Sequence, residues 1–361
     1  MSKLYADQKE QATPPSSFAD TPLTPPPTDK KSSAQAQQVV AFFRDREAGK
    51  DINQDWIAFR VAPEEYAEIE RLLSCDEALS GYVENKIRYD YDLENHQLVV
   101  RMPTRLHEFF LDGVEYAIRR RLETIRSGTG DAARFAGKVR TARSTEIFFP
   151  VENGSPDAKS KYEPDTSFWH DDAKYPGIII EVAYSQRKKK LDRLAENYLL
   201  DSKTNVQVVV GLDIEYGKKE PSKATFTIWR VRVVGDELRV VKEVEDEAFR
   251  DEQGNPTMHP GLQFHLSDFA CKRLTKDIIG CIGGEVVVST HELCQHLEVA
   301  EANIKRQDAL LEDHIPHGLK MRRRSMTPGE EVTSSDEAEY VAQAEKAMKR
   351  VADEDPDYNM H

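Results

Sequence analysis

An acidic residue that directly follows a strongly apolar run is the feature that most restricts how this chain can fold. Residues 177–180 read Gly-Ile-Ile-Ile, and the next residue is Glu181. Side chains alternate across a strand, so the run should separate into two faces. These are Ile179, Glu181 and Ala183 on one side, and Ile178, Ile180 and Val182 on the other. Burying an ionised carboxylate is costly without a partner, so we expect a basic side chain or a bound cation beside Glu181.

The composition indicates one large ordered region accompanied by long polar segments. The chain has 361 residues, of which 39% are hydrophobic and 32% are charged. No apolar run approaches the ~20 residues of a membrane span, and the N-terminal residues do not resemble a signal peptide. We therefore expect no membrane partner and a cytoplasmic or nuclear location. The net charge of -14 argues against coating of nucleic acid by bulk positive charge, but it allows basic groups along one groove.

Local composition divides the chain into four parts. Residues 1–35 are rich in Pro, Ser and Thr and are expected to be a disordered tail. Residues 36–272 are expected to form one α+β domain, with a mixed central β-sheet flanked by helices. Residues 273–318 are expected to be a helical extension, in which a helix at 289–312 is a candidate surface for a protein partner. Residues 319–361 are basic and then acidic, and are expected to be largely disordered.

Hydrophobic periodicity gives the main elements of the 36–272 region. The clearest helix spans residues 105–126, where apolar residues recur at a spacing of 3.6. A β-hairpin is predicted over residues 86–101, and residues between 165 and 177 are predicted to form a polar loop. The sheet core is expected from strands around residues 147, 180, 209 and 228.

Two polar residues lie close to the apolar stripe of the 105–126 helix. His107 falls inside the stripe, and Glu108 lies on its edge. A single histidine on an apolar face is usually a hydrogen-bonded core residue, and a glutamate at the edge is usually solvated. Both become candidate site residues if this helix packs over Asp165 and Glu181.

A pair of carboxylates is expected where two neighbouring strands end. Asp165 follows a proline, and fifteen residues separate it from Glu181. Two such carboxylates can bind Mg²⁺ or Mn²⁺ together with waters and a substrate phosphate, and such a metal activates water for attack on phosphorus. A lysine two residues after the glutamate would stabilise the added negative charge, but that position is Ala183.

Basic residues come next, at the start of the helix that follows. Lys190 and Gln186 lie on one line at the margin of its apolar stripe, so both can reach back over the sheet. Lys188 is a further candidate because it falls nearer the apolar face, and Ser185 is a candidate accessory residue. These residues are the candidates for the positive charge that Ala183 does not supply.

The pattern of Pro164 and Asp165, then fifteen residues, then Glu181-x-Ala183, resembles the PD-(D/E)XK superfamily of restriction-endonuclease-like nucleases. Similarity to uncharacterised fungal members extends over roughly residues 100–270, with its motif core at 100–216. The matching segments are residues 102–110, 164–170, 176–186, 191–202 and 206–216.

The resemblance implies a specific set of site residues. It places a metal on Asp165, Glu181 and the main-chain carbonyl of Val182, with Glu108 as a further carboxylate. In such proteins the motif lysine is often moved to the following helix, which here implies Lys190.

Two functions are compatible with these features. The first is a Mg²⁺- or Mn²⁺-dependent nuclease that hydrolyses phosphodiester bonds of DNA or RNA. The second is a catalytically inactive endonuclease-like fold that acts as a protein- or nucleic-acid-interaction module. In the second case Asp165 caps a turn, and Glu181 pairs with Lys190 or Arg187 rather than with a metal. Divalent-metal binding at the two carboxylates distinguishes these functions.

Overall fold

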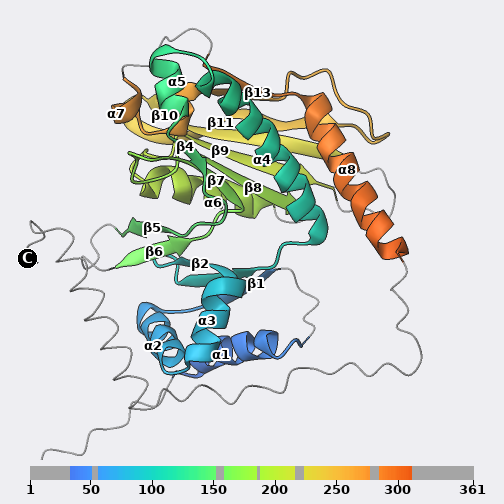
Figure 1. Ribbon diagram of the computed structural model, residues 1–361. Helices are drawn as coiled ribbons and strands as arrows, with labels where there is room; N and C mark the ends of the chain where they lie inside the picture. Colours follow the sequence, from blue (N-terminus) through green and yellow to red (C-terminus); the bar gives the residue numbers. More distant parts are fainter. Residues whose placement is uncertain are drawn as a thin grey trace, which may run out of the picture. The chain divides into compact units, whose positions relative to one another are not determined.

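The apolar run begins strand β8 (Ile178–Tyr184), which lies inside a six-stranded sheet in the computed structural model (Figure 1). The structure describes residues 33–50, 56–151, 158–184, 188–215, 223–276 and 284–310. The expected tails lie almost wholly outside these residues. The fold is mixed α+β, which confirms the fold class predicted from the sequence.

The six-stranded sheet is mixed, and β8 lies between a parallel and an antiparallel neighbour. The strand order is β11-β10-β9-β8-β7-β4. The strands other than β8 are β4 (Val139–Thr141), β7 (Thr166–His170), β9 (Val208–Ile214), β10 (Ala224–Val234) and β11 (Glu237–Arg250). Helix α6 (Lys188–Asp201) connects β8 to the parallel strand β9. All other neighbouring pairs in this sheet are antiparallel.

The two faces of β8 are covered by different helices, as the alternation of its side chains predicted. Ile178 and Ile180 share a core cluster with α4 (Arg105–Arg126) and α8 (Thr290–Ala309). Ile179 and Ala183 belong to a second cluster, which contains the apolar side of α6. The limits of α4 agree with those predicted from periodicity. Glu181 therefore lies on the α6 side of the sheet.

A second sheet, antiparallel throughout, holds the N-terminal hairpin. Its strand order is β1-β3-β2-β6-β5. The strands are β1 (Trp56–Arg60), β2 (Arg88–Asp92), β3 (Gln97–Arg101), β5 (Ile147–Pro150) and β6 (Lys159–Tyr162). Helices α1 (Ala34–Glu47), α2 (Pro63–Ser74) and α3 (Glu77–Lys86) pack with its first three strands in a third core cluster.

Two parts of the sheet arrangement differ from the sequence prediction. The strand near residue 147 was expected in the central sheet, but β5 pairs with β6 in the five-stranded sheet. β6 was not predicted because its sequence, Lys-Ser-Lys-Tyr, lacks an apolar run. The first part of the predicted polar loop after Asp165 is in fact β7, whose Ser167 hydroxyl donates to the carbonyl of Arg143, whereas residues 171–177 lie outside helices and strands. Polar residues can occupy a buried strand when such partners are present.

Residues after 272 contribute to the same core as the six-stranded sheet. The remaining short elements are α5 (Gly130–Ala136), β12 (Leu262–His265), a 3₁₀ helix (Leu266–Phe269), α7 (Lys272–Thr275) and β13 (Glu285–Val288). Leu293 and Leu297 of α8 pack in the cluster that contains α4. Within the described part of the 289–312 helix, these two apolar side chains are therefore covered by the chain itself. No helix among the described residues is long and apolar enough to cross a membrane.

The position of β8 depends on a close approach of two backbones, which gives a prediction. A Cβ atom on Gly177 would overlap the backbone of residues 268–270, whereas one on Gly81 in α3 would meet nothing within 4 Å. We expect Gly177→Ala to lower the free energy of unfolding by about 1–3 kcal/mol or more through overpacking. Gly81→Ala should raise it by about 0.5–1 kcal/mol. Urea denaturation of both variants measures the difference, and equal midpoints would contradict this packing.

Candidate site around Asp165 and Glu181

The two motif carboxylates meet where β7 and β8 pair. Asp165 directly precedes β7, and Thr166 lies opposite Ile180 in the antiparallel register. Asp165 is therefore brought beside Glu181 on the adjacent strand. Both residues are buried, with exposed fractions of 6% and 2%. Two buried carboxylates require compensating charge.

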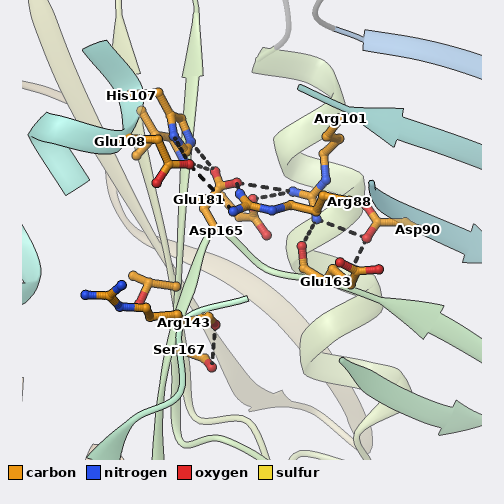
Figure 2. Close-up of polar contacts among 12 residues, drawn as sticks. Arg88, Asp90, Arg101, His107, Glu108, Arg143, Glu163, Asp165, Ser167 and Glu181 are labelled. Atoms are coloured by element: carbon orange, nitrogen blue, oxygen red, sulfur yellow. Dashed lines mark hydrogen bonds and ion pairs between the residues drawn. The ribbon is translucent and has the colours of Figure 1, made fainter. Parts of the chain in front are cut away.

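Arg101, at the end of β3, lies close to both carboxylates and supplies part of that charge (Figure 2). Its Nη1 atom lies 2.7 Å from Glu181 Oε2 and 3.7 Å from Asp165 Oδ1. Its Nη2 atom donates to Asp90 Oδ1 at 3.0 Å and to the carbonyl of Glu163. Arg101 itself is only 7% exposed. One buried guanidinium thus joins carboxylates from both large sheets.

Asp165 has three further donors. Arg88 Nη1 donates to Oδ1 at 2.9 Å, and the amide of Val182 donates to Oδ2 at 2.8 Å. His107 Nε2 lies 2.9 Å from the same Oδ2. Glu181 is held in a similar way, because the Tyr198 hydroxyl of α6 donates to its Oε1 at 2.7 Å. Every oxygen of the two carboxylates accordingly has a donor from the protein.

The first turn of α4 lies beside Asp165. His107 and Glu108, which belong to this turn, are therefore part of the candidate site. Thr104 caps the helix by accepting from the amide of His107. His107 is buried against Asp165, and its Nδ1 atom is 3.6 Å from Glu108 Oε1. The Glu108 side chain is half exposed, and its Oε1 is 3.6 Å from Arg88 Nη2. Glu108 therefore contacts the basic residues around Asp165.

Lys190 lines the same small pocket as both carboxylates. The pocket has a volume of about 50 Å³, and its lining includes Asp165, Glu181, Ala183 and Lys190. The Lys190 ammonium lies 4.6 Å from the centre of the Trp56 ring, as expected for a cation–π contact.

The side chains of three other predicted residues lie outside the described part of the chain. Gln186 and Ser185 lie outside the described residues. Lys188 is the first residue of α6, and the position of its side chain is likewise outside the described part.

Burial and charge move the pKa values of the cluster in opposite directions. Burial raises the pKa of Glu181 to about 8, although Arg101 acts against this. Burial also raises the pKa of Asp165, but His107, Arg101 and Arg88 outweigh it and hold that pKa well below its usual value. Burial lowers the pKa of His107, but Asp165 more than offsets it, so that pKa rises to about 9. His107 is therefore a cation at neutral pH.

The donor set can be tested against the metal that the family resemblance implies. Within the described ranges, no three His, Cys, Asp or Glu side chains form a group that could hold a metal ion. The permanently charged guanidinium of Arg101 contacts Glu181 and lies near Asp165, the two residues that would hold the cation. Glu108 contacts Arg88 and His107, which are the partners of Asp165. These residues do not fit a divalent cation while Arg101 holds its place.

The basic partners of the site were missed at the sequence level. The motif pattern points to residues after Glu181, whereas Arg88 and Arg101 come from the hairpin about 80 residues earlier. One signal was present in the sequence: both are charged residues within predicted strands. The observed hairpin register places them opposite each other. Like charges in directly opposed positions are unfavourable unless acidic groups lie nearby.

Comparison with known proteins adds no family to this description. No protein-family model matches the chain, and no curated protein sequence matches it.

The shifted pKa values predict a stability that falls as the pH rises. His107 is protonated more readily in the folded chain, so its contribution is complete below pH 6.5 and is lost towards pH 9. Glu181 also binds its proton more tightly when folded, so stability decreases from its ordinary pKa of 4.5 to about 8. We expect the free energy of unfolding to decrease by roughly 1–3 kcal/mol between pH 6.5 and 9.

Urea denaturation at a series of pH values measures this effect. His107→Gln should reduce the slope between pH 6.5 and 9, because the titrating group is gone. His291→Gln, at an exposed position of α8, is the control and should keep the wild-type slope. A wild-type stability that rises over this pH range would contradict the assigned charges.

Proposed function

We propose that this chain is an endonuclease-like domain that does not cleave nucleic acid and acts as an interaction module. One observation carries the proposal: the Arg101 guanidinium lies beside both Asp165 and Glu181, the carboxylates that would hold a catalytic cation. The absence of lysine at Ala183 agrees with it. The carboxylate pair then serves to join β3 to β7 and β8.

Arg101 is poorly suited to leave this position. Its charge cannot be removed by deprotonation in a protein. It is 7% exposed, and its Nη2 atom is also held by Asp90 and the carbonyl of Glu163. Withdrawing it would leave three buried carboxylates without their shared donor, which is strongly unfavourable.

The cluster reaches charge balance without a metal ion. With every group ionised, four carboxylates face three basic groups, and the proton that Glu181 holds below its raised pKa of about 8 makes the numbers equal. A divalent cation would then add uncompensated charge. The carboxylates are Asp90, Glu108, Asp165 and Glu181, and the basic groups are Arg88, Arg101 and His107. Cation binding would therefore require the loss of protons from the cluster or the displacement of an arginine.

This arrangement predicts how the protein responds to divalent metal. Arg101→Gln should lower the free energy of unfolding by about 3–5 kcal/mol, because buried carboxylates lose their partner. Mg²⁺ or Mn²⁺ should restore part of the lost stability in this variant and leave the melting temperature of the wild type unchanged. Differential scanning fluorimetry with a metal titration measures both effects.

The control is Arg250→Gln, which removes a fully buried arginine held by Glu301 in another part of the core. Its stability should fall without recovery on adding metal. Should Arg101→Gln fail to fold, the wild-type titration still decides the question. A wild-type melting temperature that rises with Mg²⁺ or Mn²⁺ would contradict the proposal that Arg101 prevents metal binding at Asp165 and Glu181.

A metal-dependent nuclease is the second candidate, and it is favoured by the location of Lys190 in the pocket that holds both carboxylates. If the wild type cleaves DNA or RNA with Mn²⁺, Lys190→Ala should reduce the rate about 100- to 1,000-fold, the usual cost of losing one electrostatic donor. Lys189→Ala should change little. Adding Ala183→Lys to Lys190→Ala should restore part of the activity. If the wild type cleaves neither DNA nor RNA with Mn²⁺, the nuclease function is excluded and the non-cleaving interaction module is retained.

A further inference from the structure

A basic groove lies between the C-terminal half of α4 and the edge strand β4. It has a volume of about 660 Å³, and β4 is the last strand in the order of its sheet. Four arginines line it, together with a single acidic residue, Glu123. The arginines are Arg119, Arg120, Arg126 and Arg140. We call this feature the α4–β4 groove.

The charge of the groove is only partly neutralised. Arg126 pairs with Glu123, and Arg140 pairs with Asp171 at 3.1 Å. Arg119 and Arg120 are exposed and have no ion-pair partner within the part of the chain that the structure describes. The whole chain carries a net charge of -14, so this positive excess is a local exception. Such a groove attracts a polyanion.

Two further features of the groove are those of a binding surface. The Tyr116 side chain lines it and is 55% exposed, so its ring is accessible to a ligand. Thr141 also lines it, and its hydroxyl is buried and has no hydrogen-bond partner among the described residues. A buried polar atom without a partner calls for one from a ligand or a water.

We infer that the α4–β4 groove binds single-stranded nucleic acid. Arginines bind backbone phosphates, and an exposed aromatic ring offers a stacking surface for an unpaired base. A duplex keeps its base faces covered and cannot stack on Tyr116. An acidic peptide would pair with Arg119 and Arg120 but would leave the ring without a matching partner.

The groove is separate from the carboxylate site. His107 and Arg119 are twelve residues apart on α4 (119 minus 107), which corresponds to about 18 Å along the helix axis. Binding there requires none of the groups around Arg101. The inference rests on the proposed function only in naming what the interaction module binds.

Fluorescence anisotropy with labelled single-stranded RNA and DNA tests the inference on the full-length chain. Arg119→Ala combined with Arg120→Ala should weaken binding about 10-fold or more at low salt. It should also reduce the slope of log affinity against log salt by about 1.4, since each single-strand phosphate contact contributes about 0.7. The matched control removes two exposed arginines of the β10–β11 hairpin, Arg232 and Arg239, and should leave binding unchanged.

The stacking role of Tyr116 has its own signature. Tyr116→Ala should weaken binding about 5- to 100-fold with the salt slope unchanged, and Tyr116→Phe should bind like the wild type. Failure to bind either single strand overturns the inference, as does equal binding of a duplex. Displacement by polyglutamate as readily as by unlabelled oligonucleotide would overturn it too and point to an acidic protein. The metal titration of Arg101→Gln is independent of all these results.

Discussion

The contact on which the site depends is the buried guanidinium of Arg101. It binds Glu181 of the six-stranded sheet and Asp90 of the five-stranded sheet through different nitrogen atoms. Without it, three carboxylates would face one another in a space almost closed to water. An arginine suits this place because its planar guanidinium can donate to several acceptors at once. The position of β3 against β7 and β8 follows from this shared donor.

Much of the fold was readable from the sequence, because strong periodicity depends little on the rest of the chain. The limits of α4 and the two faces of β8 are examples. The strands that escaped prediction, β6 and β7, are rich in polar residues. Their burial depends on partners from remote segments, such as Lys161 with Glu146 and Glu163. Such partners cannot be read from a local window.

The candidate site was predicted in its acidic half and missed in its basic half. The sequence called for a basic side chain or a cation beside Glu181, and the structure has Arg101 there. Motif spacing favoured Lys190 as the basic residue because it lies close to Glu181 in the sequence. The contact between Arg101 and Glu181 spans 80 residues, and only the pairing of β2 with β3 and β6 brings the hairpin to the site. Topology, rather than spacing, determines which charges meet.

The register of the hairpin has a consequence for cooperativity. β2 and β3 place Arg88 directly opposite Arg101, so the isolated hairpin carries two adjacent like charges. Asp165 and Glu181, which relieve this repulsion, belong to segments that enter the chain 64 or more residues later (165 minus 101). Asp90 of β2 pairs with only one of the two arginines, and the ion pair of Glu181 is with Arg101 of the hairpin. The two large sheets should therefore form and unfold in one transition, with no partly folded state in which only one of them persists.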